Sequence, residues 1–183
     1  MTLLACRASE AGAGLSFCQG YSPDLVSGLL QTSEYAAAVL RLVVDFYGTP
    51  DDIEAGVAAR TARAQYVGQE DRTFHILLGD EALNTHLGGP EAMRGQLRRL
   101  LDAMDLPGLS LGIIPARAPR SLSWRRILDL RRPQGRGRGI PRGRDDPDQD
   151  RVDLFRKAFG LLHPSAVYGQ AARDLITAVL ATS

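Results

Sequence analysis

The sequence predicts an α+β domain in which helices pack on a small mixed sheet. Three observations support this prediction. A strand–helix–strand pattern covers residues 74–115, helix patterns stand before and after it, and hydrophobic residues make up 44% of the 183 residues. A chain of this size and apolar content is sufficient for one domain with its own core.

Composition divides the chain into four parts. The expected parts are a weakly ordered N-terminus (1–20), the core of the domain (21–116), an anomalous basic and then acidic segment (117–155), and C-terminal helices of the same domain (156–183).

The central pattern predicts two parallel strands joined by a helix. Residues 74–78 are an apolar run of the length of a buried strand, and residues 109–114 form a second such run that ends at a proline. Between them, a helix is expected over 90–105, since Pro90 suits a first helical turn and Pro107 ends the pattern. The connection is long enough for a parallel crossover. The expected apolar stripe of this helix is Met93, Leu97, Leu100, Leu101 and Met104, and Gln96 is assigned to its solvent face with Arg94, Arg98 and Arg99.

Three further helices are predicted from apolar spacing. The first runs from Glu34 to about Tyr47, with Thr32 or Ser33 as its cap, and the second runs over 53–67. The last covers about 170–181. The stripe expected to be buried in the first helix is Tyr35, Val39, Leu42, Val43 and Phe46, and in the last helix it is Ala171, Leu175, Ile176 and Val179.

Charge and cysteine usage indicate a cytoplasmic protein without a membrane span. The formal net charge is +1, so no global field attracts nucleic acid or membrane. No apolar stretch reaches the ~20 residues that a span needs. Cys6 and Cys18 are expected to be free thiols, as is usual in the cytosol.

No catalytic, metal or cofactor site is predicted. His75, His86 and His163 lack partners at metal-ligand spacing. The adjacent Asp80 and Glu81 follow a strand, but neighbouring carboxylates do not share one face, and they are interpreted as caps of a short helical turn over 81–87. An enzyme would need a pocket that gathers both of them with Arg60 and Tyr35, and no nucleophile is visible near them.

Residues 117–144 differ from the rest of the chain. They hold ten arginines interleaved with glycine and proline, and an acidic run follows at 145–150. This composition predicts a disordered segment near 117–150. An alternative function follows from it, namely nucleic-acid binding through an arginine-rich tail. The candidate residues for that alternative are Arg131, Arg132, Arg136 and Arg138.

Several motifs resemble one known family. They are LVSGLLQTSEYA at 25–36, with Ser27 where the family usually has proline; Val57, Arg60, Arg63 and Gln65; LLGDEAL at 77–83; GGP at 88–90; IIP at 113–115; and ARDLI at 172–176. The chain resembles an actinobacterial domain of unknown function that follows an XRE-type (lambda-repressor-like) helix-turn-helix in transcriptional regulators. The resemblance covers most of the chain outside residues 1–20 and 117–156.

The resemblance implies a non-catalytic sensing or partner-binding domain. By analogy with the family motifs, the candidate ligand- or partner-binding residues are Gln31, Thr32, Tyr35, Arg60 and Glu81. The implied partner is a small protein encoded nearby, in an antitoxin-like pairing. DNA would be contacted only through the helix-turn-helix, which residues 1–20 are too short to contain. The oligomeric state, the ligand and the operator stay open.

The family has two strands where this chain has its basic segment. With suitable synonymous codons, reading residues 124–143 one base later yields FWIFDD followed by the alternating pattern VAVEV, which is typical of a strand pair. The hypothesis is that residues from about 121 to 155 are translated out of frame between two compensating insertions or deletions.

This hypothesis predicts the result of resequencing the locus from upstream of the start codon through the codon for Phe159. Two compensating indels are expected to flank the segment, and correction should restore the strand pattern. A sequence without indels there would refute the hypothesis and leave the arginine-rich tail as a genuine feature of the protein.

Overall fold

A four-stranded sheet forms the centre of the domain. The computed structural model describes residues 3–8, 15–119 and 147–183. The strand order is β1-β2-β3-β4. The strands are β1 (Leu3–Ala8), β2 (Leu15–Ser22), β3 (Thr73–Gly79) and β4 (Leu109–Ile114), and the helices are α1 (Ser33–Tyr47), α2 (Ile53–Ala64), α3 (Glu81–Asn84), α4 (Gly89–Ala103), α6 (Pro147–Leu162), η1 (His163–Ser165) and α7 (Gly169–Leu180).

The sheet is mixed, as predicted. β1 and β2 pair antiparallel, whereas β2, β3 and β4 are parallel neighbours. Each parallel pair needs a crossover, and the chain provides α1 and α2 between β2 and β3, then α3 and α4 between β3 and β4. The α+β class and the strand–helix–strand unit are therefore confirmed.

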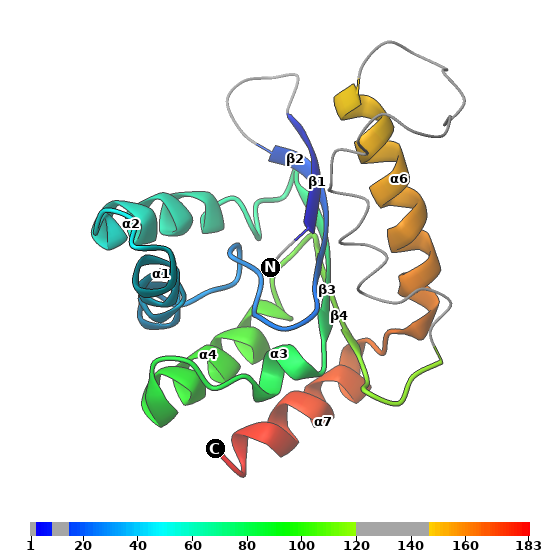
Figure 1. The fold of residues 1–183 in the computed structure, drawn as a ribbon. Coiled ribbons are helices and arrows are strands. Elements are labelled where there is room, and N and C mark those ends of the chain that lie inside the picture. Colours follow the sequence, from blue (N-terminus) through cyan, green and yellow to red (C-terminus); the bar gives the residue numbers. More distant parts are fainter. Residues whose placement is uncertain (1–2, 9–14, 120–146) are drawn as a thin grey trace.

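Alternation along the strands gives the sheet two apolar faces. On one face, Phe74 and Ile76 of β3 are fully buried with side chains of α1, α3, α4 and α7. On the other face, Leu77 lies with Phe159 and Leu162 of α6 in a second cluster. Figure 1 shows α6 on the right of the sheet and the α1–α2 pair on the opposite side, at the left.

The structure differs from the predictions at both ends of the chain. Residues 1–20 were expected to be weakly ordered, yet β1 and most of β2 form there. α6 begins at Pro147, inside the stretch expected to be irregular, and Phe155 packs against the second cluster. In α7, Ala171 is exposed and Ala172 is buried, so the expected stripe was wrong by one position there. Residues 120–146 lie outside the described residues, and they include most of the arginine-rich segment and most of the stretch hypothesised to be out of frame.

The prediction of free thiols is wrong for Cys18, which is fully buried and disulfide-bonded. Cys6, the only other cysteine of the chain, is its register partner across the β1–β2 pair. The disulfide bond was not predictable from the local pattern, because residues 1–20 carry no strand signal and it is the pairing across an antiparallel ladder that brings the two cysteines close.

Gly79, at the end of β3, allows the chain that leaves β2 to cross the strand closely. A Cβ atom at this position would lie 2.2 Å from the carbonyl oxygen of Pro23, which is backbone and cannot rotate away. This contact fixes the start of the segment that leads to α1. A side chain at position 79 would displace that segment.

Gly79→Ala is therefore expected to destabilise the fold by about 3 kcal/mol or more, because backbone must move to admit one methyl group. Urea unfolding followed by circular dichroism measures the change. Gly95→Ala, inside α4, is the matched control, because nothing lies within 4 Å of the added Cβ. This substitution is expected to raise the free energy of unfolding by roughly 0.5–1 kcal/mol, since alanine favours a helix more than glycine does. Equal effects of the two substitutions would contradict the close approach at Gly79.

Candidate functional site

Four of the five candidate residues from the family motifs are joined by hydrogen bonds around the start of α1. Gln31 Nε2 donates to the Val26 carbonyl at 2.8 Å, and Arg60 Nη1 donates to Gln31 Oε1 at 2.7 Å. The Tyr35 amide donates to Thr32 Oγ1 at 3.3 Å, so Thr32, one of the two residues predicted for this role, is the cap of α1. The Tyr35 hydroxyl oxygen in turn accepts from the Val26 amide at 3.4 Å. The network ties the 24–32 segment to α1 and α2.

Gln96, which the sequence assigned to the solvent face of α4, is fully buried at the centre of this network. Its Oε1 accepts from the Thr32 amide at 2.8 Å, and its Nε2 donates to the Leu30 carbonyl at 2.9 Å. One amide side chain thus satisfies a donor and an acceptor that the buried turn would otherwise leave unpaired. The signal was available, since position 96 lies three residues after Met93 and so shares the apolar side of the helix.

Burial changes the protonation behaviour of two residues in the network. It raises the pKa of the Tyr35 phenol, an effect opposed by the hydrogen bond from Val26 and increased by the nearby Asp24 carboxylate. Burial also lowers the pKa of Arg60, and the neighbouring Arg63 lowers it further. Among the described residues, no carboxylate forms an ion pair with Arg60. The Arg60 guanidinium instead donates its hydrogen bond to the neutral side chain of Gln31.

Glu81 does not join the network. It is exposed at the start of α3, and its backbone carbonyl accepts from the amide and hydroxyl of Thr85. Asp80 occupies the cap position of α3 without a side-chain cap bond, so the predicted capping role of its carboxylate is wrong. Within the described ranges, no group of three or more His, Cys, Asp or Glu side chains is arranged to hold a metal ion. Arg131, Arg132, Arg136 and Arg138 lie outside those ranges.

The second half of α1 is exposed, contrary to the predicted buried stripe. Tyr35 and Val39 are buried, but Leu42 is 52% exposed, Val43 40% and Phe46 78%. Tyr47 is 71% exposed, and its ring meets that of Phe46 edge-on at 4.9 Å between centroids. Since Leu42 and Phe46 continue the side of the helix that carries Tyr35 and Val39, α1 extends beyond the core with its apolar side uncovered. Leu42, Val43, Phe46 and Tyr47 are called the α1 patch.

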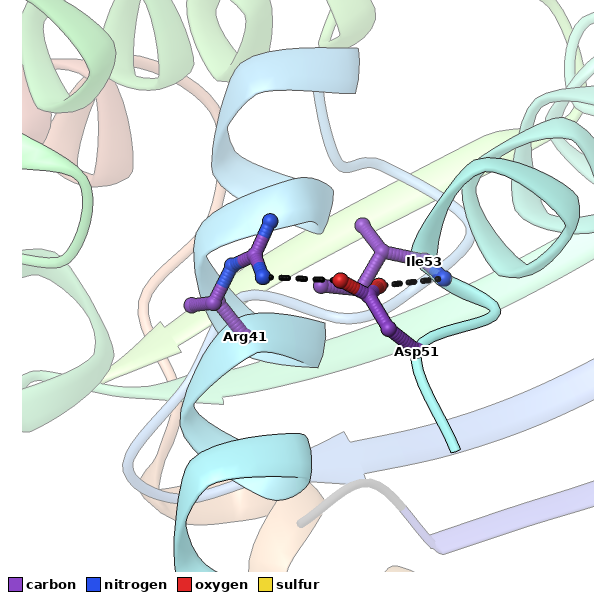
Figure 2. Close-up of polar contacts among 3 residues, drawn as sticks. All are labelled: Arg41, Asp51 and Ile53. Carbon is purple, nitrogen blue, oxygen red and sulfur yellow. Dashed lines mark hydrogen bonds and ion pairs between the residues drawn. The ribbon is translucent and has the colours of Figure 1, made fainter. Parts of the chain in front are cut away.

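The turn between α1 and α2 fixes the geometry beside the α1 patch. Figure 2 shows Asp51 between the two helices: its Oδ2 lies 3.0 Å from Arg41 Nη1 of α1, and its Oδ1 accepts from the Ile53 amide of α2 at 3.4 Å. The exposed ion pair itself contributes little stability. Asp51 still substitutes for the missing side-chain cap at Asp52 and so orients α2 against α1.

A second polar group lies on the α6 face of the sheet. Gln19, His75 and Ser110 are register partners across β2, β3 and β4. Burial lowers the pKa of His75, as does the nearby His163. Burial raises the pKa of Tyr168 to about 12, and its buried hydroxyl has no hydrogen-bond partner within the part of the chain that the structure describes.

The fold and these sites define an α+β domain with an exposed apolar surface on α1. This helix belongs to the crossover between β2 and β3, and hydrogen bonds to α4 and α2 hold its start in place. The domain matches, over residues 18–178, the family described as Domain of unknown function (DUF5753), and the chain belongs to that family. Comparison with curated proteins gave no match, and comparison with solved structures gave none either. None of the helices in the described ranges has the length and apolarity to cross a membrane.

Gln96→Leu is expected to destabilise the domain by roughly 2–4 kcal/mol, because it leaves the Thr32 amide and the Leu30 carbonyl buried without partners. Thermal unfolding monitored by calorimetry tests this. The matched control is Gln170→Leu, which removes an exposed bond to Asp174 at the start of α7 and should change stability by less than about 0.5 kcal/mol. A loss at Gln96 no larger than at Gln170 would show that the network is not structural.

Proposed function

We propose that this domain is the non-catalytic partner-binding half of an XRE-type transcriptional regulator. The family motifs in the sequence support the regulator context. The α1 patch is the observation that supports partner binding, because exposed contiguous apolar surface on a soluble domain marks interaction sites. The partner would be a small protein encoded nearby, in an antitoxin-like pairing, and DNA would be read by a helix-turn-helix domain.

The energetics of the α1 patch favour a protein partner. Full burial of a side chain such as Phe or Leu contributes about 1.5–3 kcal/mol, and Phe46 and Leu42 leave most or half of their surface in water. Aromatic residues also dominate the binding energy of protein interfaces. A pair of exposed rings at the end of a helix is therefore an effective anchor for another chain.

The network around Gln96 supports the same function by making the patch rigid. The start of α1 is attached to α4 through Gln96 and to α2 through Gln31 and Arg60. A surface held in its bound geometry loses less conformational entropy on association. Gln31, Thr32, Tyr35 and Arg60 would therefore act as positioning residues for the patch and not as its contacts.

A regulator of this kind acts in the cytoplasm, where thiols are kept reduced. The working protein would then depend on the packing around Cys18 and not on its disulfide bond.

The alternative function is nucleic-acid binding through the arginine-rich segment, favoured by ten arginines within residues 117–144. It predicts binding to DNA or RNA that weakens steeply as salt is raised and that is lost when these residues are deleted. The partner-binding function predicts that the same deletion leaves protein binding through the α1 patch unchanged.

The test is a bacterial two-hybrid screen of the chain against the products of neighbouring genes, followed by titration calorimetry with any product that binds. The double substitution Leu42→Ser and Phe46→Ser should weaken binding at least about 100-fold, since two anchors of roughly 1.5 kcal/mol or more are removed. Leu154→Ser with Leu161→Ser, on exposed apolar positions of α6, is the matched control and should leave affinity unchanged. Binding that survives the α1 substitutions would refute the proposal.

A further inference from the structure

We propose that the α1 patch receives an amphipathic helix of the partner whose flanks carry lysine or arginine. This inference rests on the proposed function and specifies the partner's chemistry. It follows from two observations, the spacing of the apolar side chains along α1 and the charge of the residues that surround the patch.

The spacing points to a helix. Tyr35, Val39, Leu42 and Phe46 follow one another at intervals of four, three and four residues, which is the repeat of a helix that packs lengthwise on another helix. The first two positions are buried in the core with α4 side chains such as Met93 and Leu97. The last two continue the repeat beyond the core. An incoming helix would complete this side of α1 with the same kind of packing that its first half already has.

The charge at the turn points to a basic partner. Asp45, Asp52 and Glu54 are exposed around the end of α1 and the start of α2, and none forms an ion pair among the described residues. Arg41, near the same turn, already forms an ion pair with Asp51. The rim of the α1 patch is therefore negative, and complementary charges at such flanking positions set the choice of partner helix.

The same negative rim argues against other occupants. Two copies of this chain that met through their α1 patches would bring Asp45, Asp52 and Glu54 of each close to those of the other, and juxtaposed like charges oppose association. Nucleic acid would be repelled for the same reason. A basic amphipathic helix matches both the apolar spacing and the rim.

Two synthetic peptides serve as probes, each a helix about three heptads long with the same leucine face. One has lysine on both flanks and the other has glutamate. Fluorescence anisotropy with the full chain is expected to show at least roughly tenfold tighter binding of the lysine peptide, decreasing with salt. The triple substitution Asp45→Asn, Asp52→Asn and Glu54→Gln should bring the two affinities together, and Leu42→Ser with Phe46→Ser should abolish both. Circular dichroism confirms that each variant is folded.

Equal affinity of the two peptides for the unchanged protein would overturn the inference, as would binding that persists in the Leu42→Ser and Phe46→Ser variant. Sedimentation velocity supplies a further test: self-association that Phe46→Ser removes would assign the α1 patch to a second copy. If a neighbouring gene product binds through the α1 patch while the peptides show no charge preference, only this inference fails. If the lysine peptide is preferred and no neighbouring product binds, the proposed function fails instead.

Discussion

The paired hydrogen bonds of Gln96 are the interaction on which the rest of the domain depends. The segment that leaves β2 must turn within the apolar interior before α1 begins, and its Leu30 carbonyl and Thr32 amide have no strand or helix to pair with there. An unmade hydrogen bond in such surroundings is costly. Gln96 supplies both missing partners from α4, so one side chain joins the two crossovers of the sheet.

The sequence predicted the fold class well where local signals were strong. The run at 109–114, Pro90 in the first turn of α4, and Thr32 as one of two candidate caps each specify their element locally, and each is confirmed. The N-terminal strands were missed because small residues dominate there and the pairing that forms β1 and β2 is not a local property.

The candidate site was only partly predictable for a related reason. Motif resemblance selected Gln31, Thr32, Tyr35 and Arg60, and the structure joins them, yet their bonds are internal. The exposed surface was predicted wrongly, since periodicity identifies the apolar side of α1 but not the point along the helix at which the core ends. That point depends on the length of the elements packed beneath α1, which no pattern within α1 itself encodes.

The α1–α2 pair lies in the chain between β2, which precedes α1, and β3, which follows α2, and these two strands are parallel neighbours in the sheet. Because α2 is mostly exposed and buries few apolar side chains of its own, it has the features of an element that opens before the sheet does. Slow hydrogen exchange would then belong to the β3 and β4 amides and faster exchange to α2. Because hydrogen bonds attach the start of α1 to α4, such opening would displace α2 while the α1 patch keeps its geometry and the sheet keeps its register.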